Sequence, residues 1–348
     1  MAKRKPKDST ALNDSIFHQV EVEELKSRLA DLNERHKHTL AMFKESNAQL
    51  RAILGLKEEI EGHPPKHMKV LPSGETGEST AVLVASDWHL EERVDPKTVD
   101  GVNEFNPIIA EARVTKLFQR GLSMVEMTRH RTRIDTMVLA VLGDLISGYI
   151  HEDLAESNYL SPTEASLKAY RLVCGGIDFL LKEGKFKKLL VPCTIGNHSR
   201  TTKRPRIQTA AKNSFEWMLY HLLADKYSKE PRVEFSITDG YFNFVNVYAT
   251  RLRFHHGDNV RYQGGVGGVE IPLNKALAQW NKYRPVDIDI LGHWHTRKTA
   301  TNFVVNGSLI GFNAFAVATK CSYEPPSQSF FLIHPKWGKT IEIPILFD

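Results

Sequence analysis

The sequence predicts an α/β fold in which a two-sheet β-sandwich is flanked by helices. From Ala81 onward, short and partly β-branched apolar runs such as AVLVAS, TMVLAVLG and KLLVPCTIG alternate with stretches of helical periodicity, and the later part is rich in strand-like runs. The composition, 41% hydrophobic and 25% charged, is that of a globular protein. Apolar runs stay shorter than the roughly 18 residues that a membrane span needs.

A heptad-like series precedes this region. Its positions alternate in steps of three and four: Val22, Leu25, Leu29, Leu32, His36, Thr39, Phe43, Ser46, Leu50 and Ile53. The spacing is typical of a coiled coil and predicts a homo-oligomer, although a single amphipathic helix on the protein's own body fits the same pattern. The Gly, Pro and Ser residues that follow indicate a linker. We therefore expect a basic tail and helical coiled-coil arm at 1–61, a linker at 62–80 and an α/β domain at 81–348.

Three helices are expected inside the α/β domain. They cover Ile108–Arg129, Ser161–Leu181 and Ile207–Tyr227, and the second opens with a capping box formed by Ser161 and Glu164, with proline at the first helical position. Further strands are expected in VEFSI, FNFVNVYATRLRFHH, VDIDILG, NFVVNGSLIG, SFFLIH and TIEIPILF. Few helices are expected between these later strands.

Polar blocks follow five of the apolar runs. They are Asp87-Trp88-His89, Gly143-Asp144, Gly196-Asn197-His198, His256-Gly257 and Gly292-His293-Trp294-His295. Glycine lets a loop pass close to a site, and the two-residue spacing within Asp87–His89 and His293–His295 would put each pair on one face of a strand end. His255 is the alternative donor to His256, which is favoured because glycine follows it.

The donor types point to a metal site. Asp, Asn and His together suit Mn²⁺, Fe, Ni or Zn in a mixed nitrogen and oxygen site. Cys174, Cys193 and Cys321 have no spacing typical of a zinc site or of a disulfide framework. The chemistry expected of these loops is therefore that of a metal centre without thiolates.

The ordered series D-x-H, G-D, G-N-H, H and G-H-x-H resembles the calcineurin-like metallophosphoesterases over Ala81 to Asp348. The resemblance implies that 81–348 is a metallophosphoesterase domain with two divalent metal ions, Mn²⁺ foremost, which clamp a phosphate and activate a hydroxide nucleophile. It assigns Asp87, His89 and His295 to one metal, Asn197, His256 and His293 to the other, Asp144 to a bridge between them, and His198 to proton donation beside the scissile phosphate.

Two departures narrow the resemblance. Ser199 and Arg200 follow the G-N-H block, where many family members have Asp or Glu, so any carboxylate that orients His198 must come from elsewhere. The GDLISG block also lacks the Arg-Gly continuation of the protein Ser/Thr phosphatases. The chain is therefore nearer to the SbcD-like nucleases and other phosphodiesterases.

A basic run follows the G-N-H block directly. In SRTTKRPR, the cations Arg200, Lys203, Arg204 and Arg206 predict a lip that binds substrate phosphates, and a solvated loop is the alternative. Arg261, at the start of the glycine cluster RYQGGVGG, is a further phosphate contact to consider. Residues 147–162 either cover the site as a lid or pack on its rim.

Together these patterns favour a metal-dependent phosphodiesterase that acts on DNA or RNA as a nuclease. The alternatives are a small-molecule phosphodiesterase or phosphomonoesterase, and a non-catalytic binding or structural oligomer. Nucleic acid and further copies of the chain are the expected partners, and no membrane is expected. The basic start MAKRKPKDST lacks a following apolar stretch and the cysteines suit a reducing compartment, so we expect a cytoplasmic protein, in the host cytoplasm if it is phage-encoded.

Overall fold

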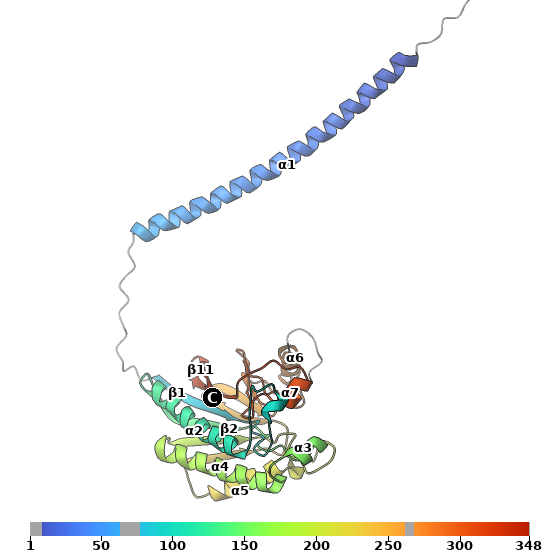
Figure 1. The fold of residues 1–348 in the computed structure, drawn as a ribbon. Coiled ribbons are helices and arrows are strands. Elements are labelled where there is room, and N and C mark those ends of the chain that lie inside the picture. The colour runs from blue at the N-terminus through green and yellow to red at the C-terminus, as the bar shows by residue number, and fades with distance from the viewer. Residues whose placement is uncertain (1–8, 63–76, 262–267, 348) are drawn as a thin grey trace, which may run out of the picture. The chain divides into compact units, whose positions relative to one another are not determined.

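The computed structural model describes residues 9–62, 77–261 and 268–347, and the chain divides into two compact units, Met1–Leu71 and Pro72–Asp348. The described part of the first unit is one helix, α1 (Ser9–Gly62), drawn in blue in Figure 1. Apolar side chains of the predicted stripe, including Leu25, Leu29 and Phe43, are exposed on it. The predicted helix is present, and its pairing into a coiled coil stays a prediction.

Two β-sheets form the centre of the second unit. The first has the strand order β11 (Gly338–Leu346), β10 (Ser327–His334), β1 (Gly77–Ala85), β2 (Thr132–Val141), β3 (Lys188–Cys193) and β4 (Val233–Ile237), with β1 to β4 parallel. The second has the order β5 (Asn243–Val247), β6 (Thr250–His255), β7 (Ile288–Leu291), β9 (Phe303–Val305) and β8 (Lys298–Thr299). Here β6, β7 and β9 are parallel.

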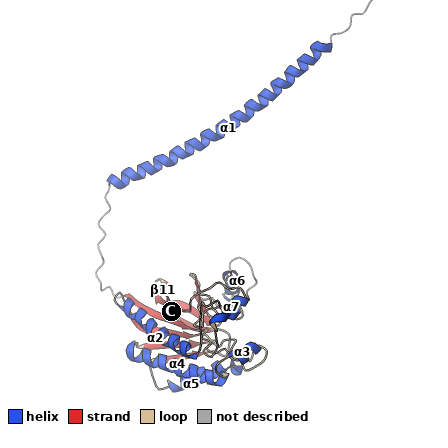
Figure 2. Ribbon diagram, viewed as in Figure 1, coloured by secondary structure: helices blue, strands red, loops and turns tan. Residues whose placement is uncertain are grey.

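Side chains of alternate residues along the central strands face different layers. Leu83 of β1 belongs to the core beneath the helices α2 (Pro107–Arg129), α4 (Pro162–Glu183) and α5 (Phe215–Lys226). Val82 packs instead against residues of β6 and β7, between the two sheets. A third cluster joins α6 (Glu270–Trp280) to the second sheet. Helices therefore lie on the outer face of each sheet, as Figure 2 shows in blue and red, and the predicted fold class is confirmed.

The start of α4 was predicted correctly from its capping residues. The capping box of Ser161 and Glu164 is present at the start of α4. The third predicted helix begins later than expected, since residues 207–210 form a loop in which Ile207 is 97% exposed, and α5 starts only after its N-cap Ser214. The predicted start of this helix at Ile207 was therefore wrong, because the apolar side chain of Ile207 lies in solvent and not on a buried helix face.

Several elements differ from the expected pattern. The first strand begins at Gly77, four residues before the predicted start. The run FNFVNVYATRLRFHH forms the antiparallel hairpin of β5 and β6, and NFVVNGSLIG contributes only the three residues of β9. Short segments also appear as η1 (Pro96–Thr98), α3 (Glu152–Ser157), η2 (Ala211–Asn213) and α7 (Ala314–Ala318), and α6 was not expected. Across the described ranges, helices long enough to cross a bilayer are too polar to do so.

Candidate metal centre

The polar blocks all lie in loops at the carboxyl ends of strands. They follow β1, β2 and β3 of the first sheet and β6 and β7 of the second, and parallel neighbours bring such ends to one edge. The loops also bond to one another. The backbone N–H of Trp88 donates to the carbonyl of Asp144 at 2.8 Å, and that of Gly292 donates to the carbonyl of His256 at 2.8 Å. The backbone N–H of His293 donates to Asp87 Oδ1 at 2.8 Å and joins loops of the two sheets, so one site is assembled from both.

Glycine is required where two of these loops approach most closely. A Cβ atom on Gly196 would overlap the Asp144 carboxylate, and one on Gly143 would overlap the backbone of Gly196. Gly143 also has a φ of +83°, which side chains rarely tolerate. The loops after β2 and β3 could not pack in this way with a side chain at either position, as the sequence pattern predicted.

The backbone beyond β1 and β7 adopts left-handed turns instead of continuing as strands. Asp87 and His89 have φ values of 54° and 49°, and His293 and His295 have values of 71° and 51°. The expectation that strand alternation aligns each pair was therefore wrong. In each block a left-handed residue stands on either side of a tryptophan that is not left-handed, and Trp88, the first of these tryptophans, is fully buried.

Donor atoms converge at this edge in three groups among the described residues. Within each group the ligand atoms lie within 4.8 Å of one another: Asp87, His89 and His295; Asp144, His256 and His293; and His89, Asp144 and His198. Asn197 Oδ1 lies 3.1 Å from His256 Nε2 and adds an amide oxygen to the second group. The first two groups match the two ligand sets that the resemblance implies, and Asp144 lies between them. The ligand roles themselves stay predictions.

The surroundings of His256 fit a cation. Its Nδ1 donates to the carbonyl of Leu142 at 2.8 Å, which leaves the lone pair of a neutral ring on Nε2. That atom lies 2.9 Å from Asp144 Oδ2 and 3.1 Å from Asn197 Oδ1, both of which are also acceptors. A divalent cation would satisfy all three atoms, whereas without one the ring must hold an extra proton.

The pKa shifts of the clustered side chains also agree with a site for a cation. Burial alone would lower the pKa of His256, but the Asp144 carboxylate raises the pKa of that ring well above its usual range. Burial raises the pKa of Asp87 to about 7 and lowers the pKa of His295 to about 3. Buried carboxylates and neutral imidazoles with few basic partners are the donors that a divalent cation requires.

His198 is held by the main chain. Its backbone N–H donates to Asp144 Oδ1 at 2.8 Å, and its Nδ1 donates to the carbonyl of Ser147 at 2.9 Å. The group that orients this imidazole is therefore a peptide carbonyl and not a carboxylate from elsewhere in the chain. Ser199, in the position that is acidic in many family members, is fully buried and bonds to Ser214.

The neighbouring His255 faces away from this site. It is fully buried beside the rings of Trp280 and Tyr241, and its Nε2 lies 3.4 Å from Asp289 Oδ1. Asp289 in turn binds the buried Arg253 through two hydrogen bonds of 2.6 and 3.0 Å. The choice of His256 as the donor agrees with this arrangement.

The basic run begins at the site and then extends into solvent. Arg200 is half-buried, and its Nη1 donates to the carbonyl of Asn197 at 2.8 Å. Lys203, Arg204 and Arg206 are exposed and have no carboxylate partner in the part of the chain that the structure describes. Arg261 is exposed as well. The glycine cluster after it lies mostly outside the described residues, at 262–267.

Residues 147–162 fold against the edge of the site. The backbone N–H groups of Ser147 and Gly148 both donate to Glu91 Oε1, at 2.9 and 2.8 Å, and α3 follows. The ring of His151, which sequence reasoning treated as an ordinary surface or core histidine, lies 6.1 Å from that of His198. Tyr149, two residues before His151, is 51% exposed. This segment is therefore part of the rim around His198.

Sequence reasoning missed the buried carboxylate of Glu216. Its two oxygens accept from the backbone N–H groups of Leu145 and Gly196, each at 2.7 Å. Those residues follow Asp144 and precede Asn197, so the first turn of α5 joins the two loops that carry these donors. The glutamate is separated from its partners by 71 and 20 residues, and no local pattern could have revealed it.

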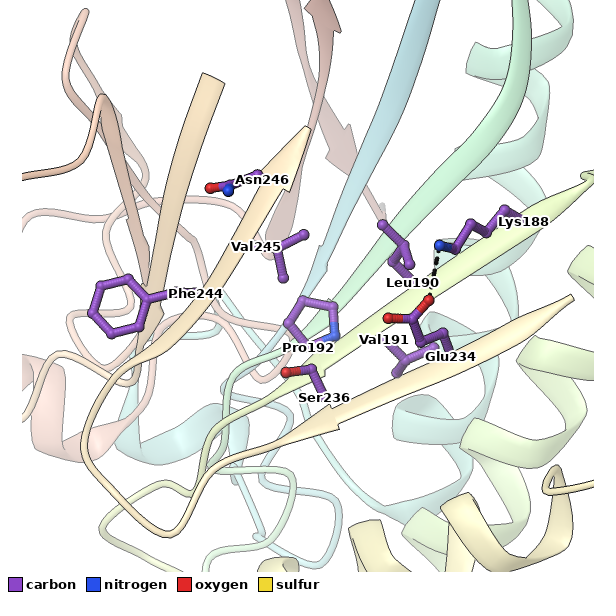
Figure 3. A pocket seen from close by; sticks show the side chains of 9 residues that line it. All are labelled: Lys188, Leu190, Val191, Pro192, Glu234, Ser236, Phe244, Val245 and Asn246. Atoms are coloured by element: carbon purple, nitrogen blue, oxygen red, sulfur yellow. Dashed lines mark ion pairs between the residues drawn. The ribbon is translucent and has the colours of Figure 1, made fainter. Parts of the chain in front are cut away.

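A separate cleft lies between the edges of the two sheets. Its volume is about 230 Å³, and its walls come from β3, β4 and β5. Figure 3 shows Lys188 and Glu234 directed toward each other there, with an ion pair of 2.8 Å between them. None of the described lining residues is a predicted ligand, so this cleft is distinct from the metal centre.

Comparison with known proteins finds similarity only at the level of structure. No protein-family model and no curated sequence matches the chain. Similar solved structures include Vacuolar Protein Sorting 29 from Cryptosporidium parvum, with 11% identity, a TM-score of 0.33, and coverage of 77% of this chain and 98% of that one. Protein PH1004 from Pyrococcus horikoshii OT3 has 11% identity, a TM-score of 0.37 and coverages of 77% and 89%. The calcineurin-like phosphoesterase YfkN from Bacillus subtilis has 10% identity, a TM-score of 0.31 and coverages of 78% and 91%.

Proposed function

We propose that this chain is a calcineurin-like metallophosphoesterase that hydrolyses phosphodiester bonds, and that its substrate is DNA or RNA. The observation that carries the proposal is the convergence of the seven predicted ligands. They come from five separated sequence blocks and supply the two donor sets of a dinuclear centre at one edge of the molecule. Mutually repelling buried donors of this kind destabilise a fold unless a cation compensates them.

The residues of the site have separable tasks. Divalent cations bound there would supply Lewis-acid charge to the phosphate and lower the pKa of the attacking water. Asp144 belongs to the second donor group and also lies within 4.8 Å of His89 of the first, where its carboxylate would offset the repulsion of two cations. His198 holds Nδ1–H against the Ser147 carbonyl, so its Nε2 is the atom that would carry a proton to the leaving oxygen.

The rim of the site supports a nucleic-acid substrate. The exposed cations Lys203, Arg204 and Arg206 extend from the loop that holds His198, and no carboxylate among the described residues neutralises them. A polyanion gains affinity from such cations by releasing its counterions.

Substrate assays test the proposal directly. With Mn²⁺ present, the protein is expected to hydrolyse bis-p-nitrophenyl phosphate and to degrade single- or double-stranded DNA or RNA, and Asp144→Asn should abolish these activities. Hydrolysis of p-nitrophenyl phosphate alone would instead identify a phosphomonoesterase. Diester hydrolysis without degradation of nucleic acid would point to a small-molecule phosphodiesterase. Bound metal without any turnover would favour a binding or structural protein.

The basic loop can be tested apart from the chemistry. Arg204→Ala is expected to weaken DNA binding and to reduce the slope of log K against log salt concentration by about 1, because one phosphate contact is lost. The matched control is Lys229→Ala, an exposed cation that precedes β4 at the opposite end of the first sheet. An Arg204→Ala variant whose salt slope equals that of the wild type would assign this loop to solvent alone.

A further inference from the structure

We propose that Glu92 is a positioning residue that orients the candidate metal ligand His89 through the hydroxyl of Ser147. The inference rests on the proposed metal centre and adds to it a carboxylate that belongs to neither donor group. Glu92 lies in a buried environment close behind His89, with its side chain 12% exposed.

With Glu92 ionised, the hydrogen bonds that link it to Ser147 and His89 have one consistent direction. Ser147 Oγ lies 3.0 Å from Glu92 Oε2, and because a carboxylate only accepts, the serine must donate its single proton there. His89 Nδ1 lies 2.8 Å from the same Oγ and must therefore donate to it. This fixes the proton of a neutral His89 on Nδ1 and leaves the Nε2 lone pair free, which is the tautomer that a metal ligand needs.

The free nitrogen points at the site. His89 Nε2 lies 3.1 Å from Nε2 of His295, its partner in the first donor group. The direct separation of His89 Nδ1 and Glu92 Oε2 is 3.8 Å, so the serine fills the gap between the ring and the carboxylate. A carboxylate behind a ligating imidazole fixes the ring and increases its basicity toward the metal.

Glu92 is itself held in place by a different segment. Asn313 Nδ2 donates to Glu92 Oε1 at 2.9 Å, while Asn313 Oδ1 caps α7 by accepting from the backbone of Ala316 at 3.0 Å. Among the described residues, Glu92 forms no ion pair with a lysine or arginine. Its charge is therefore directed to the chain of Ser147 and His89 and does not neutralise a nearby cation.

Ser147 serves both candidate imidazoles at once. Its hydroxyl accepts from His89, and its main-chain carbonyl accepts from His198. His256, in contrast, donates its Nδ1–H directly to the carbonyl of Leu142. The Glu92 carboxylate thus supports only the donor group of Asp87, His89 and His295, so its removal should affect that group and spare the other.

The test compares Mn²⁺ affinity at the two donor groups by titration calorimetry. In Glu92→Gln, affinity at the group of Asp87, His89 and His295 is expected to fall about 10- to 100-fold, with the other group unchanged. Ser147→Ala should reproduce the loss, and ¹⁵N NMR of metal-free protein should show that the His89 ring no longer holds its proton only on Nδ1. The matched control is Glu104→Gln, which changes an exposed carboxylate that belongs to neither donor group.

The outcomes separate this inference from the proposed function. Unchanged Mn²⁺ affinity in Glu92→Gln, or an equal loss at both donor groups, would overturn the positioning role while leaving the metal centre intact. A wild-type protein that binds two Mn²⁺ ions but hydrolyses no phosphoester would overturn the proposed function, and a selective loss in Glu92→Gln would still support the positioning role. A wild-type protein that binds no Mn²⁺ would overturn both.

Discussion

Five of the predicted ligand residues hold left-handed backbone conformations, namely Asp87, His89, Asp144, His293 and His295. Each such residue costs about 1 kcal/mol or more relative to an ordinary conformation, although Asp and His tolerate it better than most. The cost is met by the surrounding contacts, such as the hydrogen bond from the backbone of His293 to Asp87 Oδ1 at 2.8 Å. Strain concentrated in these residues is what a preorganised site requires, because relaxed strand ends would not aim the donors at one point.

At the residue scale, Gly196→Ala is expected to destabilise the fold by more than about 3 kcal/mol and to remove diesterase activity. The new methyl group would overlap the Asp144 carboxylate, and overpacking of this kind typically costs about 1–3 kcal/mol before the loop is displaced. Chemical denaturation measures the effect. The control is Gly175→Ala in α4, where a Cβ meets nothing within 4 Å and stability should rise by about 0.5–1 kcal/mol. Equal effects of the two substitutions would contradict the close approach of the loops.

Proton donation by His198 predicts a dependence on the leaving group. In His198→Gln, kcat for a diester with an alkoxide leaving group should fall about 10²- to 10⁴-fold, because that oxygen needs a proton. Hydrolysis that expels p-nitrophenolate should fall far less, because this anion leaves without protonation. Steady-state rates on the two substrates measure the difference, with the exposed His130→Gln as control. Equal losses on both substrates would instead indicate a role in holding the metal or the phosphate.

At the scale of elements, α1 presents an apolar stripe that no described residue of its own unit covers. We propose that further copies of the same helix cover it in a coiled coil, since the stripe recurs at heptad spacing with exposed leucines. Such exposure is a marker of an interaction surface.

The coiled coil is tested by placing charges on the stripe. Leu29→Glu together with Leu32→Glu should reduce the mass in solution to that of one 39.5 kDa chain, as measured by analytical ultracentrifugation. Ser27→Glu with Ala30→Glu, which lie off the stripe on the same helix, should leave the wild-type mass unchanged. Hydrolysis of small diesters should persist in both variants. A wild-type protein that already sediments as a single chain would refute the pairing.

At the scale of the whole molecule, the proposed metal centre would link cation binding to the free energy of unfolding. Its donors come from both sheets, so a cation bound only by the folded state would hold the two sheets together at this edge. Mn²⁺ at about 100 times its dissociation constant should add about 2.7 kcal/mol of unfolding free energy per site. In a unit of this size, that corresponds to an increase in Tm of roughly 5 °C or more.

Thermal unfolding with EDTA and with Mn²⁺ measures this linkage. The wild-type protein is expected to melt at a higher temperature with Mn²⁺, whereas Asp144→Asn should show little difference between the two conditions because it lacks the shared carboxylate. Identical melting temperatures of the wild-type protein in EDTA and in Mn²⁺ would count against a cation site at this edge.

The sequence by itself determined whatever depends on neighbours along the chain. The capping box of Ser161 and Glu164 starts α4 because its partners are three residues apart, and the continuous apolar run of β1 is typical of a strand buried on both faces. The order of the polar blocks likewise located the donors, since each block follows its strand directly. These features depend on residues close together in the sequence, so they can be predicted without knowledge of the tertiary structure.

Only the tertiary structure decided how the donors are aimed and supported. The left-handed turns at Asp87 and His293 follow from contacts between loops, and Glu216 bonds to backbone groups as many as 71 residues away. The carbonyl of Ser147 lies behind His198 because the fold places β2 and β3 side by side. Such contacts stabilise the fold, but no local sequence pattern reveals them, because their partners come within hydrogen-bond distance only in the folded chain.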